Sequence, residues 1–419
     1  MMADQLTPLS TTCCIVGGGP CGMMLGYLLA RAGVDVVVLE KHADFLRDFR
    51  GDTIHPSTLE LMHELGLLSD FLGLPHQEVP TLKARFGGLE FTAADFGHLP
   101  TRCKFIALMP QWDFLNFLCA RGRRYPGFRV LMRAEATDLI EEQGAVVGVR
   151  AHTPDGALEL RAPLVAGCDG RHALTRQRGG LAVENLGAPM DVLWFRMRRR
   201  PDDPADTMGV FDAGRILVQI NRGDYWQCGY VIPKGSFEEV RRGGLAPFRA
   251  QLARAVPMFA DRVGELASWD QIKLLTVTVD RLTRWYRRGL LCIGDAAHAM
   301  SPVGGVGINL AVQDAVAAAN ILAQPLAAGA VDEDLLRRVQ QRREFPTRVI
   351  QRMQVLVQQH VITGVLGTQA EIKPPLAVKL LRAFPILRRI PARIVGMGVR
   401  PEHIRTPEPP MAPKPAGVA

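Results

Sequence analysis

The sequence predicts an α/β protein in which a split, doubly wound parallel-sheet domain carries an inserted antiparallel sheet and a helical C-terminal region. Residues 12–40 have the pattern of a buried strand, a helix and a second buried strand, which begins a parallel sheet. Apolar strands at 164–170 and 290–298 can join that sheet. Between them, residues 190–233 alternate apolar and polar side chains between turn residues, which is typical of antiparallel strands.

The individual elements follow from the spacing of apolar residues and from the residues that interrupt it. Gly33 ends the first helix, which covers 20–33, and Gly66 ends a second helix, which starts near Pro56. Further helices are expected over 112–124, 236–267, 306–323 and 332–366, and further strands over 128–165 and 271–282.

These elements divide the chain into five segments. We expect a first part of the parallel-sheet domain over 1–185, the antiparallel-sheet domain over 186–282, a return segment of the first domain over 283–330, a helical region over 331–405 and a disordered tail over 406–419.

The composition is that of an ordinary globular protein. The 419 residues are 47% apolar and show no internal repeat. Eight cysteines are scattered without CxxC or Cys/His spacing, which indicates free thiols in a reducing compartment and no metal site. Residues 5–30 lack charge, but Gly17–Pro20 would interrupt a membrane helix and no basic region precedes it. We therefore expect a soluble, cytoplasmic protein.

The positive charge of the chain is concentrated near its C-terminal end. The formal net charge is +8, and residues 373–405 contain eight basic residues and one acidic residue. No nucleic-acid motif spacing occurs, so a nucleic-acid partner is not predicted. Apolar residues alternate with arginines in this stretch, which allows weak contact with an anionic membrane. The favoured alternative is a pair of short helices packed on the parallel-sheet domain, because Pro385 and Pro391 break a longer helix.

Three glycines form a GxGxxG motif between the first strand and the first helix. Gly17 allows a tight turn, Gly19 lets a pyrophosphate approach the backbone, and Gly22 lets the helix pack on the strand. The helix N-terminus at Pro20 offers free N–H groups to phosphates. Glu40, at the end of the second strand, can accept hydrogen bonds from ribose hydroxyls, and its charge repels a 2′-phosphate. The motif therefore predicts a Rossmann-like site for the AMP half of FAD or NAD, with a glycine-rich structural turn as the alternative.

A second glycine-rich segment lies at 290–310 (LLCIGDAAHAMSPVGGVGINL). Pro302, Gly304, Gly305 and Gly307 allow the backbone to approach a ligand, and the helix that starts near Val306 directs its N-terminus at it. Such a helix end stabilises negative charge, as on the N1–C2=O edge of a reduced flavin or on a group that gains charge during oxygen transfer. The alternative for Gly294–Asp295 is a strand-end turn with a helix cap.

Three motifs in order, over about residues 11–325, resemble the para-hydroxybenzoate hydroxylase family of flavoprotein monooxygenases. They are GGGPCG at 17–22, GCDG at 167–170, and Gly294-Asp295 with its downstream Pro-Gly loop. The resemblance implies that Asp295 holds flavin ribityl or ribose hydroxyls and that Asp169 serves FAD and the pyridine nucleotide. It also implies that Arg50 contacts the pyrophosphate and that Gln111 contacts the flavin. Val306 departs from the family, where many members have a smaller or more polar residue.

The predicted FAD-binding residues come from the first strand and helix, the middle motif and the second glycine-rich segment. They are Gly17, Gly19, Pro20, Gly22, Glu40, Lys41, Arg50, Gln111, Asp169, Gly294, Asp295, Pro302, Gly305, Gly307, Ile308 and Asn309. Of these, Pro302 and Gly305 are expected to line the flavin ring and to serve the catalytic oxygen step.

The resemblance also implies a reaction. NADH or NADPH reduces FAD, and O2 then forms a flavin C4a-hydroperoxide that hydroxylates an aromatic or polyketide-like small molecule, held against the antiparallel sheet. The sequence shows no acid–base dyad or nucleophile, which fits chemistry that depends on positioning and on exclusion of water. A second glycine motif for the pyridine nucleotide is missing, as it is in the family.

Three other functions are compatible with the same FAD motifs. The protein could be an FAD-dependent dehydrogenase or reductase that inserts no oxygen, because the motifs describe cofactor binding. A flavin-dependent halogenase shares Ile232-Pro233, but Tyr230 and Cys228 stand where its signature has tryptophans. A membrane-associated flavoprotein without catalysis is the third alternative.

Two histidines and three aromatic residues have both a structural and a functional interpretation. His298 and His55 could face the flavin, although packing is the commoner role of such residues. Trp194, Trp226 and Tyr230 lie on the inserted sheet, where they form either its core or the wall of a substrate pocket.

Overall fold

The computed structural model describes residues 7–46, 53–368 and 370–408. Its central sheet has six strands in the order β21-β22-β13-β2-β3-β9, and all neighbours are parallel except β21 and β22. The strands are β2 (Cys13–Val16), β3 (Val36–Glu40), β9 (Phe128–Met132), β13 (Leu164–Gly167), β21 (Tyr286–Arg287) and β22 (Leu290–Cys292). The predicted parallel sheet, with strands contributed by distant parts of the chain, is thus confirmed.

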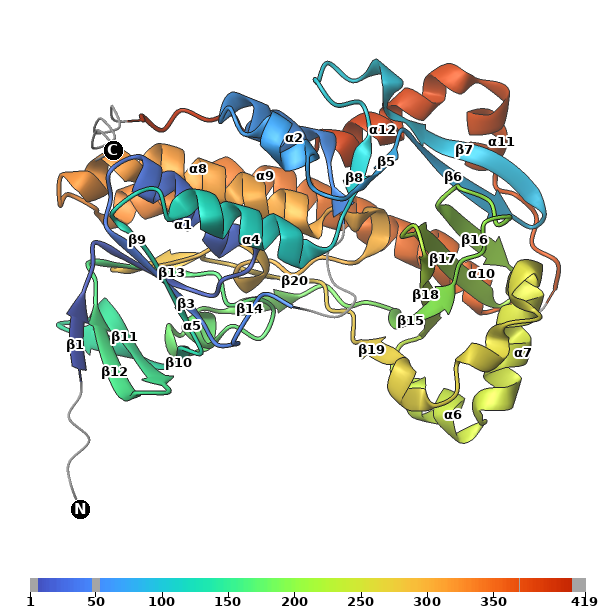
Figure 1. Cartoon of the computed structure of the whole chain (residues 1–419), viewed down its shortest axis with the longest axis horizontal. Coiled ribbons are helices and arrows are strands. Elements are labelled where there is room, and N and C mark those ends of the chain that lie inside the picture. The colour runs from blue at the N-terminus through green and yellow to red at the C-terminus, as the bar shows by residue number, and fades with distance from the viewer. Residues whose placement is uncertain (1–6, 47–52, 369, 409–419) are drawn as a thin grey trace, which may run out of the picture.

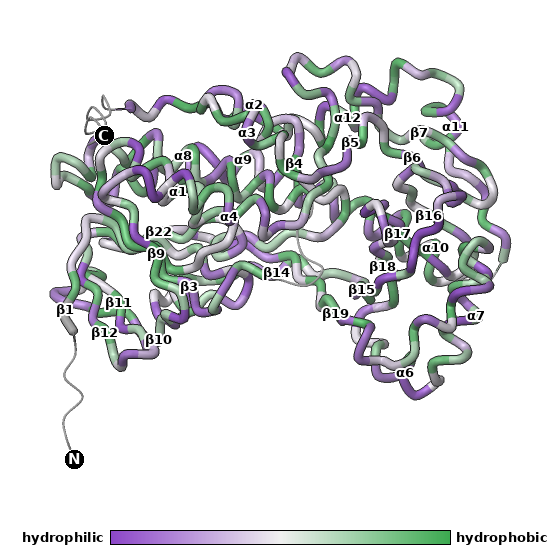
Figure 2. Tube along the Cα trace, viewed as in Figure 1, coloured by the Kyte–Doolittle hydropathy of each residue, from purple (hydrophilic) through white to green (hydrophobic). Residues whose placement is uncertain are grey.

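Helices cover one face of this sheet, and a smaller sheet covers the other (Figure 1). The helices are α1 (Pro20–Arg31), α4 (Gln111–Gly122), α8 (Gly307–Ala327) and α9 (Glu333–Val357). The smaller sheet has the order β1-β12-β11-β10 and is formed by β1 (Thr7–Ser10), β10 (Glu135–Glu142), β11 (Ala145–Thr153) and β12 (Gly156–Arg161). Hydrophobic segments gather in the central sheet and the helices above it (Figure 2), which form the largest core cluster.

A seven-stranded sheet forms the second lobe, in the order β19-β15-β18-β17-β16-β6-β7. Its strands are β6 (Thr81–Phe86), β7 (Leu89–Asp95), β15 (Met190–Arg198), β16 (Met208–Asp212), β17 (Arg215–Asn221), β18 (Tyr225–Pro233) and β19 (Lys273–Leu275). The strands from 190 onward pair antiparallel, as expected. However, β6 and β7 come from the segment assigned to the first domain, and β6 pairs with β16 in parallel. The boundary at residue 185 therefore does not separate the two sheets.

Two expected elements are interrupted in the structure. The helix expected over 236–267 is divided into α6 (Phe237–Arg242) and α7 (Leu245–Ala255), followed by short 3-10 turns at η2 (Pro257–Phe259) and η3 (Val263–Glu265). Pro257 lacks the N–H that would continue α7. The strand expected over 271–282 is divided between β19, which pairs with β15, and β20 (Asp280–Leu282), which pairs with β14 (Val183–Asn185).

The remaining helices, turns and strands are short. They are β4 (Thr53–Ile54), α2 (Pro56–Glu64), α3 (Leu68–Leu72), β5 (Gln77–Val79), η1 (Phe96–His98), β8 (Ile106–Leu108), α5 (Leu174–Arg178), η4 (Trp269–Gln271), η5 (Gly294–Ala296) and η6 (Val303–Gly305). Strands β4, β8 and β5 form a small sheet between the lobes.

The C-terminal region is helical, as predicted, but its last helices pack in a different place. After α9 come η7 (Gln358–Ile362), a π turn, and α10 (Thr363–Leu366), and then α11 (Leu376–Ala383), η8 (Pro385–Arg388) and α12 (Arg389–Gly396). Both α11 and α12 pack on β7 of the second lobe, rather than only on the parallel-sheet domain. The inner side of α12 also reaches Met300 and Val306, which precede α8.

The first three residues of the predicted disordered tail, 406–408, are packed against the protein. Thr406 is buried, and Arg31 donates to its carbonyl oxygen at 3.0 Å. Glu408 forms an ion pair with Arg31 at 2.8 Å and accepts from the Tyr125 hydroxyl at 3.0 Å. Residues 406–408 are therefore fixed to α1, and the rest of the tail lies outside the described residues.

One helix in the described ranges, Val303–Ala327, is long and apolar enough to span a membrane by length and composition. Within the protein, 83% of its apolar window is buried. It is α8 with the turn before it, and it packs between α1 and α9. Its apolar character is thus explained by its place in the core.

Candidate functional site

In the first glycine loop, residues 17–22, two glycines pack tightly against the protein and a third faces open space. Gly17 has φ +106°, and a Cβ atom there would lie 2.4 Å from the Cys168 carbonyl oxygen. A Cβ atom on Gly22 would lie 2.0 Å from the Gly17 carbonyl oxygen. By contrast, a Cβ atom on Gly19 would meet nothing within 4 Å. The backbone at Gly19 therefore faces open space, where a pyrophosphate can approach.

Helix α1 begins at this opening with free backbone donors. Gly19 is its N-cap, Pro20 is its first residue, and neither a capping side chain nor an acidic residue occupies its first turn. The first N–H groups of a helix have no partner within the helix and carry partial positive charge. This helix start is suited to bind a phosphate.

Glu40 connects the first glycine loop to the end of β3. One carboxylate oxygen accepts from the Gly18 N–H at 3.1 Å, and the other accepts from the His42 N–H at 2.9 Å. Both carboxylate oxygens therefore hold the backbone around the loop. Glu40 thus shapes the loop, and its contact with ribose stays a prediction. The neighbouring Lys41 is exposed.

The Gly294–Asp295 pair lies where α1, α8 and β22 meet. Gly294 has φ +60°, and a Cβ atom there would lie 3.1 Å from Cys21 and 3.4 Å from Ala311. The side chain of Asp295, by contrast, is 36% exposed, and its carboxylate lies 3.9 Å from the Arg171 guanidinium. Asp295 is therefore accessible to a ligand, and Arg171 is a neighbouring cation that the sequence motifs did not indicate.

Asp169 has a structural contact in addition to its expected ligand. Its two oxygens accept from the Thr175 hydroxyl at 2.6 Å and from the Thr175 N–H at 3.0 Å, near the start of α5. Burial raises the pKa of Asp169, and the hydrogen bonds from Thr175 oppose that shift. Asp169 therefore fixes the turn after β13, and its contact with a cofactor stays a prediction.

The second glycine loop, residues 302–307, precedes α8. Pro302 caps the η6 turn, and Gly304 and Gly305 have φ +81° and +63°. A Cβ atom on Gly305 would lie 2.9 Å from the Thr53 hydroxyl, which donates to the Gly305 carbonyl at 2.9 Å. A Cβ atom on Gly307 would meet nothing within 4 Å. Like α1, α8 begins without a capping side chain or an acidic first turn.

The first turn of α8 is joined to α2. The amide oxygen of Asn309 accepts from the hydroxyls of Ser57 and Thr58, both at 2.7 Å. Asn309 and Ile308 are buried. These contacts orient the helix start, so Asn309 has a positioning role whether or not it touches a cofactor.

Two predicted residues remain, of which the structure describes one. Gln111 is the first residue of α4 and is buried. Arg50, the predicted pyrophosphate contact, lies outside the described residues.

Sequence reasoning missed three glutamines of α9 and η7, which hold the backbone before and at the start of the second glycine loop. The amide of Gln354 accepts from the Ser301 N–H at 3.1 Å and donates to the carbonyls of Ser301 and Val303, both at 2.9 Å. Gln351 donates to the Ala299 carbonyl at 3.1 Å, and Gln358 donates to the Ser301 hydroxyl. The spacing of these glutamines at 351, 354 and 358 on a predicted helix was the available signal.

A buried charge network lies behind Gly294. Asp314 accepts from the Gly294 N–H at 3.1 Å, from the His298 ring and from the Arg343 guanidinium at 2.9 Å. Burial would raise the pKa of Asp314, but His298 and Arg343 lower it below its usual value. Arg343 also reaches Glu402. His298 is therefore a packed structural residue, as the favoured interpretation held.

His55, by contrast, contacts the second glycine loop region. It is fully buried at the start of α2, and its Nδ1 lies 2.7 Å from the Val395 carbonyl in α12. Its Nε2 has no hydrogen-bond partner among the described residues. Burial lowers the pKa of His55, while the Val395 and Gly305 carbonyls oppose this. The ring is thus neutral near pH 7 and positions α12 against the loop.

The three aromatic residues of the second lobe divide between the two faces of its sheet. Trp226 and Tyr230 are buried with Phe248 of α7, and Tyr230 donates to Gln251 at 2.9 Å. Trp194 lies on the opposite face, in a cluster that includes Val303 of the second glycine loop. Its buried indole N–H has no partner among the described residues. Only Trp194 is therefore on the side that can face a substrate.

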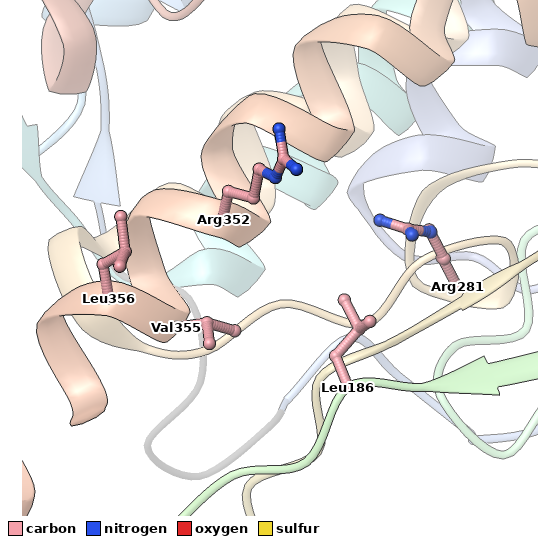
Figure 3. Close-up of a pocket in the computed structure, with 5 residues that line it drawn as sticks. All are labelled: Leu186, Arg281, Arg352, Val355 and Leu356. Atoms are coloured by element: carbon pink, nitrogen blue, oxygen red, sulfur yellow. The ribbon is translucent and has the colours of Figure 1, made fainter.

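A separate hollow of about 300 Å³ lies between α9 and the β20 segment. Figure 3 shows its lining by Leu186, Arg281, Arg352, Val355 and Leu356. Arg281 is paired with Glu184 at 2.7 Å. None of these five lining residues belongs to the predicted FAD site, so this hollow and the two glycine loops are different features.

Comparison with known proteins agrees with the geometry of the two glycine loops. A family model described as FAD binding domain matches residues 10–353. The chain is 32% identical over 406 residues to the 6-methylpretetramide 4-monooxygenase of Streptomyces rimosus, which covers 95% of this chain and 96% of that protein. It is 26% identical over 337 residues to the para-nitrophenol 4-monooxygenase of Pseudomonas sp. (strain WBC-3), which covers 77% of this chain and 80% of that protein.

A solved structure has the same fold. The crystal structure of p-nitrophenol 4-monooxygenase from Pseudomonas putida DLL-E4 matches with a TM-score of 0.75 at 21% identity, covering 93% of this chain and 97% of that chain. At this identity the likeness concerns the fold alone.

Proposed function

Because this chain belongs to the FAD binding domain family and is an FAD-dependent oxidoreductase, we propose that it hydroxylates an aromatic or polyketide-like ring, with NADH or NADPH as reductant. The balanced reaction consumes one O2, one NAD(P)H and one proton, and yields the hydroxylated ring, water and NAD(P)+. The observation that carries this proposal is the pair of uncapped helix starts, at Gly19 of α1 and Gly307 of α8, on two helices that pack together.

The residues of the first glycine loop fit the AMP and pyrophosphate part of FAD. Gly17 and Gly22 keep strand and helix in close contact, which leaves the backbone at Gly19 open to a phosphate. The start of α1 supplies N–H donors to that phosphate. We propose that Glu40 accepts a hydrogen bond from a ribose hydroxyl and that the exposed carboxylate of Asp295 accepts hydrogen bonds from ribityl hydroxyls.

The second glycine loop fits the ring end of the cofactor. When bound, FAD accepts a hydride from NAD(P)H and activates O2 for transfer to the ring. The N–H groups at the start of α8 stabilise negative charge on the ring edge. Thr53 and Gln354 hold the loop in place. The N–H groups at the start of α8 therefore need little rearrangement to meet the cofactor.

The substrate is proposed to lie between the second glycine loop and the inner face of the seven-stranded sheet. Trp194 and Val303 belong to the same apolar cluster, which brings that face and the loop together. The buried indole N–H of Trp194 has no partner among the described residues, and an unpaired buried N–H is costly. We therefore propose that it donates to a substrate oxygen. The names of the two relatives, which act on 6-methylpretetramide and para-nitrophenol, support a ring as the substrate.

We also propose that the protein works in the cytoplasm, in keeping with its thiols. All eight cysteines are buried and free. Burial raises the pKa of Cys14, Cys228 and Cys292, which keeps these thiols protonated and unreactive.

The test combines a spectrum with an isotope. Purified protein should be yellow, should bleach with anaerobic NADH or NADPH, and should transfer one ¹⁸O atom from O2 to a phenolic or polyketide ring. Bleaching and reoxidation without any labelled product, across a panel of such rings, would instead support a dehydrogenase. A protein that binds no flavin would overturn the assignment of both glycine loops.

A further inference from the structure

The C-terminal face, which we define as the outward side of α11, η8 and α12, exposes large apolar side chains. Leu376, Leu380, Phe384, Ile386 and Ile390 are between 38% and 71% exposed. They are five of the twelve large hydrophobic residues exposed in the described part of the chain, and they fall within fifteen residues. Scattered single apolar residues are normal on a protein surface, whereas a contiguous group indicates an interaction site.

The inner side of the same segment is firmly packed. Val378 and Ala392 are buried, and a Cβ atom on Gly396 would lie 2.7 Å from Leu99. Arg388 donates to the Leu381 and Arg382 carbonyls, which closes the end of α11. The apolar side chains therefore belong to packed helices, and these helices lie above β7 at the edge of the second lobe (Figure 1).

The charged residues exposed on these helices are all basic. Lys379, Arg382, Arg389 and Arg393 are exposed between the apolar residues, and no carboxylate in the described ranges lies within 4 Å of them. The one acidic residue of 373–405 is Glu402, which is buried and paired with Arg342 at 2.6 Å. The surface thus offers apolar side chains and unpaired cations together.

We propose that the C-terminal face docks on the surface of an anionic lipid bilayer. Charge complementarity identifies this occupant, because apolar residues that enter the boundary region and cations that remain among headgroups are the pattern of interfacial helices. Pro385 divides the segment into two short helices, which can lie flat on a surface but cannot span it.

The docked orientation places the lipid close to the second glycine loop. The inner side of α12 carries Val395, whose carbonyl accepts from His55 and whose side chain would lie 3.9 Å from a Cβ atom on Gly304. One layer of helix therefore separates the C-terminal face from this loop. A ring substrate of low water solubility could then be taken from the membrane, whereas lipid docking itself does not depend on the reaction proposed above.

The experiment is co-sedimentation of the full-length, flavin-loaded protein with vesicles of phosphatidylcholine alone or mixed with phosphatidylglycerol. We expect binding to the anionic vesicles only, weakened by salt. Phe384→Ser with Ile386→Ser, and separately Lys379→Glu with Arg382→Glu, should each lower the bound fraction about tenfold or more. The matched controls are Phe345→Ser on α9 and Arg241→Glu with Arg254→Glu on α6 and α7, which should bind like wild type.

Each result decides the proposal. Flavin absorbance and NAD(P)H oxidation with a water-soluble ring should be unchanged in the C-terminal variants, which shows that they fold. Equal binding of wild type and these variants, or no binding by any of them, would overturn lipid docking. A wild-type dimer that becomes monomeric in the Phe384→Ser, Ile386→Ser variant would assign the face to a second copy of the chain instead.

Discussion

The Nδ1 atom of His55 lies 2.7 Å from the Val395 carbonyl oxygen, which joins the start of α2 to α12 beside the second glycine loop. Because a carbonyl only accepts, Nδ1 carries the proton in this contact. The other ring nitrogen is buried without a partner among the described residues. A neutral ring satisfies this geometry, whereas a charged ring would be a buried charge, which burial disfavours more than the Val395 and Gly305 carbonyls favour it.

This contact predicts a pH dependence of stability. The pKa of His55 is lowered from the ordinary value of 6.5 by burial, so the unfolded chain binds the proton more readily than the folded chain. The stability that the buried neutral ring of His55 contributes is therefore present above about pH 6.5 and is lost as the pH falls below it. We expect His55→Gln to have a flatter melting temperature between about pH 5 and 7 than wild type. Parallel pH profiles of the two proteins would contradict the role of His55.

Gln354 is predicted to hold the second glycine loop in its working shape. Gln354→Leu leaves one N–H and two carbonyls of residues 301–303 without a partner, which should lower the free energy of unfolding by about 2–5 kcal/mol. Flavin should remain bound, but coupling of NAD(P)H oxidation to hydroxylation should fall because the loop loses its fixed position. The control is Gln341→Leu on the exposed side of α9, which should behave like wild type. Full coupling in Gln354→Leu would assign the glutamine to stability alone.

The parts of the fold that the sequence predicted depend on local signals. The strand, glycine loop and helix at 12–31 follow from apolar runs and from the glycines between them. Gly17, for example, has φ +106°, a backbone conformation that favours glycine. The start of α8 and the open position at Gly307 were likewise predictable from their glycines.

The parts that were not predicted depend on partners distant in the sequence. Strand β6 has an ordinary strand pattern, but its parallel pairing with β16 joins residues more than a hundred positions apart. Glu40 was predicted to face ribose, and its bond to the Gly18 N–H becomes visible only when the loop is folded. The alternating pattern also could not show that Trp194 and Trp226 lie on opposite faces of the sheet. Packing of the whole sheet decides which face meets the cofactor lobe.

Two glycines of the first loop should respond in opposite ways to alanine. Gly22→Ala would place a Cβ atom 2.0 Å from the Gly17 carbonyl, so we expect loss of several kcal/mol of stability, about 3 or more. Gly19→Ala meets no protein atom within 4 Å and has φ −75°, which alanine adopts freely. This variant should melt like the wild-type apoprotein but bind FAD about tenfold more weakly. Unchanged FAD affinity in Gly19→Ala, measured by flavin fluorescence, would place the pyrophosphate elsewhere.

Asp295→Ala should remove most of the bound flavin while leaving the fold intact. The side chain is 36% exposed and its nearest cation, Arg171, is 3.9 Å away, so its loss breaks no buried pair. A hydrogen bond to a charged group contributes about 1.5–3 kcal/mol, which corresponds to about a tenfold to hundredfold loss of FAD affinity. The measurement is the ratio of flavin to protein absorbance after purification, with Asp270→Ala as an exposed control. Normal flavin content in Asp295→Ala would contradict its predicted role.

The buried pair of Asp203 and Arg262 should control the stability of the second lobe without affecting the cofactor. The guanidinium makes two bonds to the carboxylate, at 2.6 and 2.7 Å, and the Trp226 indole donates to the same carboxylate at 2.9 Å. The bond from Arg262 lowers the pKa of Asp203, so this contribution is present at neutral pH and is lost only as strong acid protonates the carboxylate.

Arg262→Met leaves the buried carboxylate without its cation and should destabilise the protein by about 3–5 kcal/mol in urea unfolding. Asp203→Leu combined with Arg262→Met removes both charges and should recover part of that loss, because no unpaired charge then remains in the core. Flavin content should be normal in the folded double variant, since Trp226 and its neighbours pack on α7, on the sheet face opposite Trp194. A double variant less stable than Arg262→Met would show that Asp203 contributes mainly through its other hydrogen bonds, from the Trp226 indole and the Arg200 N–H, rather than through the ion pair.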